Sequence, residues 1–188
     1  MPAVKSLPPS LTIWWIDDGS QVSQGYLGEY GDGFKDVDHP TAAEINAGLN
    51  ITCALTTDLT LGWTDRDTDD TRGLCDDSNV SNPTSKNYEG QLNVFLDRDP
   101  NKTEESIYND VFKLFKKPLR SGYLVQRISK HPVRNPTAVD GDWVTIFKFY
   151  SGDPNVINDA TAPLQMQPTF YPQGISSDGI VQVGSVGS

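Results

Sequence analysis

Apolar and polar residues alternate along several short stretches of this chain, which is the period of a β-strand that buries one face. The segment Leu11–Ile16 is the strongest early example, because it is rich in β-branched and aromatic residues. The same reading predicts further strands at Asn50–Leu55, Leu59–Trp63, Gln91–Leu96, Gly122–Ile128, Trp143–Tyr150, Met166–Tyr171 and Ile180–Val183. We therefore expect a mainly β (α+β) protein.

The segment of about residues 103–117 shows the helical period instead. Thr103 can cap this helix at its start, and Pro118 ends it. Its apolar side chains form a stripe that can lie on a sheet: Ile107, Val111, Leu114 and Phe115. Strand, helix and strand thus follow one another between Tyr88 and Ile128, and a helix covering one flank of a β-sandwich leaves little room for a conventional active site.

Two local signals refine these boundaries. Thr41 and Glu44 have the spacing of a capping box, which predicts a short helical turn. Pro168 lies inside a predicted strand, and proline cannot donate to a sheet ladder, so this strand is expected at an edge or at a bulge.

The chain is expected to fold as one domain, which spans residues 11–183. Residues 1–10, broken by prolines, predict a flexible N-terminal arm, and residues 184–188 a C-terminal tail. Long loops are expected at 17–40 and 65–87, where glycine and acidic residues dominate.

Composition excludes several classes of protein. The chain has 188 residues, 36% of them hydrophobic, and a mean hydropathy of −0.45, which is lean for an enzyme. No apolar run approaches the roughly 20 residues of a membrane-spanning helix. The N-terminus lacks the apolar region of a signal peptide. We expect neither membrane insertion nor secretion.

The charge is negative overall but unevenly spread. A net charge of −10 argues against a protein that wraps DNA. Residues 102–134 hold eight basic and three acidic side chains, a net +5, which leaves −15 for the rest. A basic band on an acidic molecule favours self-association through complementary charged patches. A helix face exposed to solvent would give the same pattern of charges in the sequence. The candidate contacts in this band are Lys113, Lys116, Lys117 and Arg120.

Catalytic patterns are missing from the sequence. The two histidines, His39 and His131, each precede a proline and are far apart. No nucleophile elbow, phosphate-binding loop or dinucleotide fingerprint occurs. Asp140 and Asp142 have a spacing more typical of a turn than of an acid–base pair. We expect no catalytic residue, no cofactor and no enzyme activity.

Metal binding is not expected either. Asp65–Asp69 begins like a calcium loop, but its sixth position is Asp70 instead of glycine and its twelfth is Asp76 instead of glutamate. A solvated acidic loop is the favoured interpretation, with calcium binding as the alternative. Cys53 and Cys75 have no histidine pattern beside them for zinc, and two buried thiols are expected.

Trp14 and Trp15 are neighbours in a predicted strand, so one ring lies on each face. One is expected in the core and the other toward a partner, a second layer or solvent. We favour a subunit contact over the alternative, a carbohydrate platform to which Trp63 would also contribute.

Several stretches, taken in order along the chain, resemble a known family. They are Pro40–Cys53, Asp69–Cys75, the strand–helix–strand segment with Gly122–Val125, and Tyr171–Val183. Between about residues 11 and 183 the chain is similar to major tail tube proteins of long-tailed phages (siphoviruses), of the type found in actinobacteriophages. The resemblance implies a β-sandwich with one flanking helix and long loops or arms.

The same resemblance implies assembly. Rings of subunits, usually hexameric, would stack into a hollow tube, and neighbouring inner sheets would join into one ring-wide barrel without exposed strand edges. Implied partners are further copies of the chain, the tape measure, terminator and distal tail proteins, and double-stranded DNA that passes without specific binding. The protein would be assembled in the host bacterial cytoplasm and end in the virion tail.

A bore that carries DNA should be electronegative, because each neutralised phosphate releases counterions and strengthens binding. The candidate lumen-facing side chains are Glu89, Gln91, Asn93, Asp97 and Gln126. Alternatives to a tube subunit remain at this stage: a carbohydrate-binding β-sandwich, another tail component such as a tail terminator or a head–tail connector, and a calcium-dependent hydrolase.

Overall fold

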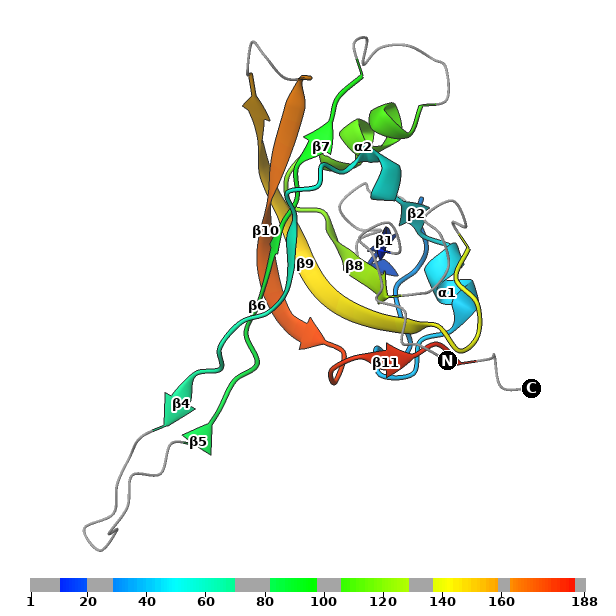
Figure 1. Ribbon diagram of the computed structural model, residues 1–188, viewed down its shortest axis with the longest axis vertical. Helices are drawn as coiled ribbons and strands as arrows, with labels where there is room; N and C mark the ends of the chain where they lie inside the picture. Colours follow the sequence, from blue (N-terminus) through cyan, green and yellow to red (C-terminus); the bar gives the residue numbers. More distant parts are fainter. Residues whose placement is uncertain are drawn as a thin grey trace, which may run out of the picture.

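A large antiparallel sheet forms the centre of the molecule. The computed structural model describes residues 11–19, 29–69, 82–97, 106–128, 137–158 and 163–184. Seven strands form the sheet in the order β2-β1-β8-β9-β10-β7, with β11 paired to the start of β9 (Figure 1). They are β1 (Leu11–Asp17), β2 (Leu49–Asn50), β7 (Val94–Phe95), β8 (Ser121–Ile128), β9 (Trp143–Ile157), β10 (Gln165–Ser176) and β11 (Val181–Gln182).

Shorter elements complete the fold. Two helices, α1 (Ala42–Asn46) and α2 (Ile107–Phe115), and one 3₁₀ turn, η3 (Thr52–Ala54), lie beside the sheet. Four strands form two further pairs: β3 (Thr60–Trp63) with β6 (Tyr88–Gln91), and β4 (Thr68–Asp69) with β5 (Asn82–Pro83). The expected fold class, a mainly β protein of sandwich type with a flanking helix, is confirmed. Within the described residues, no helix is both long and apolar enough to cross a membrane.

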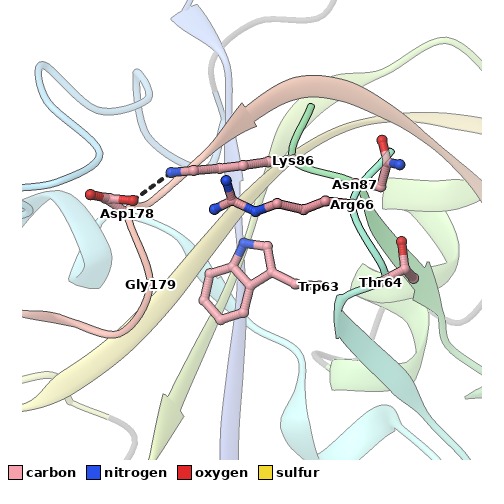
Figure 2. Close-up of a pocket in the computed structure, with 7 residues that line it drawn as sticks. All are labelled: Trp63, Thr64, Arg66, Lys86, Asn87, Asp178 and Gly179. Atoms are coloured by element: carbon pink, nitrogen blue, oxygen red, sulfur yellow. Dashed lines mark hydrogen bonds and ion pairs between the residues drawn. The ribbon is translucent and has the colours of Figure 1, made fainter. Parts of the chain in front are cut away.

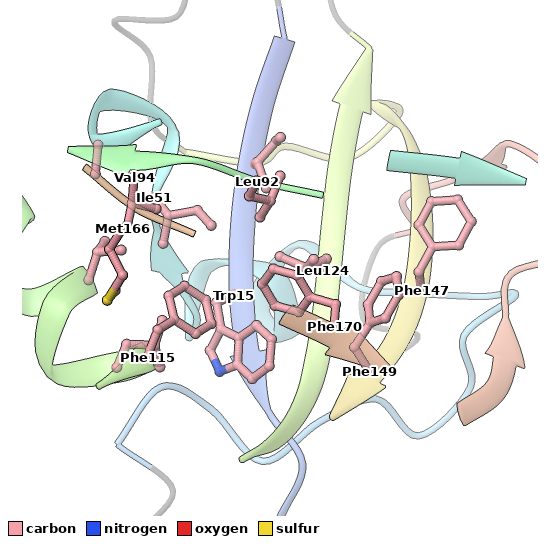
Figure 3. Close-up of a cluster of buried hydrophobic side chains, with 14 of the residues drawn as sticks. Trp15, Ile51, Leu92, Val94, Phe115, Leu124, Phe147, Phe149, Met166 and Phe170 are labelled. Carbon is pink, nitrogen blue, oxygen red and sulfur yellow. The ribbon is translucent and has the colours of Figure 1, made fainter. Parts of the chain in front are cut away.

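Both faces of the main sheet are covered. One face carries Trp15, which packs edge-on against Phe115 of α2 with ring centroids 5.2 Å apart, and lies beside Phe170 (Figure 3). This first cluster also buries parts of η3, β6 and β7. The second cluster, on the opposite face, holds Trp14 beneath Ile45 of α1. Successive side chains of a strand point to opposite faces, and here each face has its own cover.

The helix α2 lies between β7 and β8, as the strand–helix–strand prediction requires, but it is shorter than expected. Its N-cap residue is Ser106, whose backbone is extended, so the helix begins at Ile107. The predicted cap Thr103 therefore does not start this helix, and it lies outside the described residues. The predicted apolar stripe faces the first cluster, where Val111, Leu114 and Phe115 are buried.

The two local sequence signals are confirmed. The backbone N–H of Thr41 donates to Glu44 Oε2 at 2.9 Å, and the N–H of Glu44 donates to Thr41 Oγ1 at 3.3 Å. This reciprocal capping box starts α1. Pro168 lies opposite Pro154 of β9, and the pairing of β9 and β10 shifts register between Pro168 and Phe170. Such a shift is a bulge, the position at which a strand tolerates proline.

Two predicted strands are interrupted in the structure. The strand expected at Asn50–Leu55 ends at Asn50, because Thr52 turns away into η3. The Asn50 side chain accepts from the Thr52 N–H at 3.1 Å, and Thr52 Oγ1 accepts from the Ile13 N–H at 2.8 Å. The Thr52 hydroxyl thus takes the place of a backbone carbonyl from a neighbouring strand as the acceptor for the Ile13 N–H. The strand expected at Gln91–Leu96 is divided into β6 and β7 at the buried Leu92.

The expected loop 65–87 contains part of a β-ribbon. We call residues 60–69 and 82–91 the arm: β3 and β6 form its root, and β4 and β5 continue it away from the sheet (Figure 1). In the other expected loop, 17–40, residues 29–40 form no helix or strand, yet Phe34 and Val37 pack on the second cluster.

Gly122 of β8 tests the packing of the first cluster. A Cβ there would lie 2.4 Å from the Trp15 indole and 2.6 Å from the Ile16 carbonyl oxygen. We expect Gly122→Ala to lower the free energy of unfolding by about 1–3 kcal/mol, as overpacking does. Gly62→Ala is the matched strand control, since a Cβ at Gly62 meets nothing within 4 Å. Urea denaturation should show a clear midpoint shift for the first variant only, and equal midpoints would contradict this packing.

Candidate subunit-contact surfaces

An enclosed ion pair holds the end of β1. Arg120 donates from Nε to Asp17 Oδ1 at 2.7 Å and from Nη2 to Asp17 Oδ2 at 2.6 Å. Trp15 Nε1 also donates to Asp17 Oδ1, at 2.9 Å, and the ring of Tyr30 lies 5.4 Å from the guanidinium carbon. Both charged side chains are buried. Arg120 was expected to contact another subunit, and that prediction is wrong because its charge is satisfied inside the chain.

Tyr30 shares this environment. Burial, together with the nearby carboxylates of Glu29 and Asp110, raises the pKa of its phenol to about 12. Lys148 and Asp18 form a partly buried pair nearby on the sheet, 2.7 Å apart. Burial lowers the pKa of Lys148, but hydrogen bonds and charge interactions with Asp18 and Tyr123 together outweigh burial, so the net pKa is raised.

A second enclosed ion pair lies at the other end of β8. Arg127 donates to Asp142 Oδ2 at 3.0 Å and to the Thr137 carbonyl at 2.8 Å, and its guanidinium lies 5.1 Å from the centre of the Trp14 ring. Asp142 is therefore a structural partner, while Asp140 is exposed in the turn before β9. The interpretation of this spacing as a turn agrees with Gly141, whose φ is +88°.

The basic band is therefore smaller on the surface than in the sequence. Arg120 and Arg127 are internal, whereas Lys113, Lys116 and Lys117 are exposed around the C-terminal end of α2. Lys113 lies 3.5 Å from Asp110, one turn earlier on the helix. The three lysines stay candidates for a subunit contact. Lys102, Lys130 and Arg134 lie outside the described residues.

The tryptophan pair is wholly internal. Trp14 and Trp15 do lie on opposite faces, as the strand period predicts, but both are buried within the one chain. The prediction that one of them contacts another subunit is wrong, because the cover for each face comes from distant parts of the same sequence. The same burial removes both rings from any carbohydrate platform.

Trp63 is the tryptophan at the root of the arm, and it is 38% exposed. It lines a shallow pocket of about 250 Å³ together with Arg66, Lys86 and Asp178 (Figure 2). One ring face is used inside the molecule, since the Trp63 and Phe147 ring centroids are 4.9 Å apart. Lys86 pairs with Asp178 across the pocket, which ties the arm root to the turn before β11.

The candidate lumen residues lie in two separate parts of the chain, at 89–97 and at Gln126 of β8. Glu89 and Gln91 are exposed on β6, where the intervening Gly90 faces Phe149, so both point away from the core. Asn93 and Asp97 follow and are half-buried. Gln126 is half-buried on β8, between the register partners Ile13 and Thr145. Four of the five candidates thus share one segment, and their orientation to a bore stays a prediction.

The longest open sheet edges belong to the hairpin of β9 and β10. Strand β8 pairs with β9 only from Trp143 to Tyr150, and β7 pairs with β10 only at Gln165 and Met166. Within the described residues, β9 from Gly152 onward has β10 as its one strand partner. Val156 on this edge is 62% exposed and Tyr171 of β10 is 53% exposed. The sequence predicted a strand that ends at Tyr150 and missed these edges.

Metal-ligating and thiol groups do not gather in the part of the chain that the structure describes. There, no three side chains among His, Cys, Asp and Glu are close enough to hold a metal ion. Residues 70–81, which include Cys75 and most of the candidate calcium loop, lie outside that part. Cys53 is exposed, so the expectation of a buried thiol is wrong for it. His39 is exposed and bonds Asp36, which raises its pKa.

Comparison with known families decides the identity of this fold. A protein-family model described as phage tail tube protein matches residues 29–184, which is most of the chain. The chain belongs to the phage tail tube protein family. A search of curated proteins found no match. The family is a structural one and not an enzyme family, so the protein is a structural component of the phage tail that assembles with itself and with other tail components.

The buried pair of Asp17 and Arg120 gives a prediction for this tail tube protein. Asp17→Asn keeps the shape of the side chain but leaves a buried cation without its counter-charge, and we expect a loss of about 3–5 kcal/mol in the free energy of unfolding. Asp110→Asn, which breaks the exposed pair with Lys113, is the control and should cost under about 1 kcal/mol. Chemical denaturation measures both, and similar losses would show that the enclosed pair has no special role.

Proposed function

We propose that this protein is the major tail tube subunit of a siphovirus of the actinobacteriophage type. Six copies form a ring, and stacked rings form the hollow conduit through which DNA is ejected. The observation that carries this proposal is the open β9–β10 hairpin in a chain of the tail tube family. Within the described residues, the outer edge of β9 has no strand partner from Gly152 onward, and that of β10 has one only at Gln165 and Met166. Closing such edges around a ring removes them from solvent.

The edge of β9 has defined chemistry. Pro154 and Pro168 face each other, and neither has an N–H, so they occupy a pair without mutual hydrogen bonds. Hydrogen-bonded and non-hydrogen-bonded pairs alternate along an antiparallel ladder, so the pair of Val156 and Met166, two positions further on, is also non-hydrogen-bonded. The N–H and C=O of Val156 therefore point to the open side of β9. A neighbouring strand can add here through main-chain hydrogen bonds, and the exposed Val156 side chain adds apolar contact.

The electrostatic balance supports passage of DNA. The net charge of −10 is not changed by the internal pairs, but two cations of the basic band are withdrawn from the surface. A bore lined by Glu89, Asp97 and the amides of Gln91, Asn93 and Gln126 would repel the duplex and release no counterions on contact. The exposed lysines of α2 would then lie on a surface that meets other subunits.

Further parts of the proposal follow from the family. The tube would meet the tape measure protein inside, and the terminator and distal tail proteins at its ends. Assembly would take place in the host bacterial cytoplasm and the product would be part of the virion. The arm would reach between stacked rings.

Electron microscopy and light scattering of the purified protein, with a tail assembly initiator supplied, test the proposal. We expect hollow rings or tubes with six-fold symmetry. A solid particle, or a bore wall of positive potential in a reconstruction, would contradict it. Persistent monomers that bind glycans saturably, with binding lost in Trp63→Ala, would favour a carbohydrate-binding module instead.

The hairpin edge gives a sharper prediction. Val156→Asp places a charge on the open edge of β9 and should abolish tube growth, because the carboxylate would be desolvated between strands. The fold should survive, since Val156 is largely exposed. Ile180→Asp is the matched control, because Ile180 is an exposed apolar residue away from this hairpin. Equal assembly of Val156→Asp and the unaltered protein, at unchanged circular dichroism, would show that this edge is not an interface.

A further inference from the structure

Leu119, in the connection between α2 and β8, has an unusual backbone and an unusual exposure. Among the described residues other than glycine, it is the one with a positive φ, +65°. This conformation crowds the Cβ of an ordinary residue and costs free energy, so it persists only where neighbouring contacts hold it. The Leu119 side chain does not supply these contacts, because it is 60% exposed. The backbone must therefore be held from elsewhere.

Ser151 of β9 holds this backbone. The Leu119 N–H donates to the Ser151 carbonyl oxygen at 2.6 Å, and the Ser151 N–H donates to the Arg120 carbonyl oxygen at 2.9 Å. The Arg120 N–H donates to Ser151 Oγ at 3.1 Å. These bonds continue the ladder of β8 and β9 past its last strand pair. Since Asp17 also holds the Arg120 side chain, the position of Leu119 is fixed both by the sheet and by the buried ion pair.

The open edge of β9 begins beside Leu119. Within the described residues, β9 from Gly152 onward has β10 as its one strand partner. The chain that precedes Leu119 leads back to α2 instead of continuing along this edge. A strand that adds to the open edge would therefore lie in line with β8, with one of its ends at the exposed leucine side chain.

We propose that Leu119 is an apolar stop, which sets the register of β10 from a second copy of the chain on the open edge of β9. Strands β9 and β10 are antiparallel, so rotation about a ring axis places β10 of one copy beside β9 of the next, again antiparallel. The C-terminal half of the added β10 then lies toward Leu119. It carries exposed apolar surface at Tyr171, Pro172 and Ile175. The stop rests on the proposed ring.

A stop is useful because the main chain alone specifies the register weakly. Hydrogen bonds along an antiparallel ladder repeat every two residues, so an added strand could slip by two positions and still be bonded. Pro154 and Pro168 each remove one donor, which disfavours some of these registers. A side chain at the end of the ladder blocks any slip toward β8. Glycine would relieve the backbone at position 119, but it would supply no side chain for this contact.

Substitutions at position 119 separate assembly from folding. Leu119→Asn keeps a residue that tolerates the left-handed backbone but removes the apolar side chain. We expect a urea midpoint no lower than that of the unaltered protein. The lowest concentration at which tubes form with initiator, measured by light scattering, should rise about tenfold or more, as loss of a central apolar contact does. Leu119→Met restores an apolar side chain and should form tubes close to the original concentration.

Val139→Asn is the matched control, because it removes another exposed apolar side chain, in the turn at the opposite end of β9. It should leave the concentration needed for tubes unchanged. An unchanged concentration in Leu119→Asn, or an equal rise in Leu119→Met or Val139→Asn, would overturn the proposal. A lower urea midpoint in Leu119→Asn would also overturn it, since the leucine would then serve the fold.

Photo-cross-linking identifies the strand that lies against position 119. A benzophenone amino acid replaces Leu119 in tubes grown from a mixture of isotopically light and heavy chains, and adducts are mapped by mass spectrometry. Adducts between chains within residues 165–176 support the stop, whereas adducts to another segment or within one chain overturn it. If the unaltered protein forms tubes while these tests fail, only the stop is overturned. If it forms neither rings nor tubes, the conduit itself is overturned, and the stop with it.

Discussion

Both faces of the main sheet are buried inside a single chain, and this constraint decides where an assembling subunit can offer contacts. Trp15 is covered by α2 and its neighbours, and Trp14 by α1 and residues 29–40. Since the covers belong to the same chain, another copy cannot pack face to face over these parts of the sheet. Among the described residues, the surfaces left to a partner include the edges of the β9–β10 hairpin, the arm, and the exposed lysines at the C-terminal end of α2.

Enclosed ion pairs stabilise the strand ends from which these surfaces emerge. Asp17 and Arg120 join the end of β1 to the connection between α2 and β8, and Arg127 and Asp142 join the end of β8 to the start of β9. Leaving a buried cation without its partner costs free energy, so each pair holds together the two strand ends that it joins. They also change how the charge pattern is interpreted. Two residues of an apparent basic band serve the interior, and their partners lie 103 and 15 residues away in sequence.

Much of the fold could be predicted from local patterns, and the failures have physical causes. Alternation located β1, β8 and β11, and the capping box located α1. The period of two placed one tryptophan on each face, but it could not show that distant segments cover both. Thr52 ended a predicted strand because its hydroxyl bonds the Ile13 backbone. The exposure of Trp143 could not be predicted either, since it depends on where the cover of the sheet stops. Sequence alone therefore favoured as a contact one of two tryptophans that the structure buries.

The stretch after Tyr150 shows how pairing overrides local signals. Gly152 and Pro154 are turn residues by composition, yet they continue β9, because Pro154 meets Pro168 where neither needs an N–H. The missing donors face outward, so each edge of the hairpin has a gap in its ladder. An unbroken strand edge can pair with any extended chain. An edge that lacks one N–H donor pairs well only with a strand that needs no hydrogen bond at that position. The prolines thus limit indiscriminate pairing along the edges that the proposed ring closure would use.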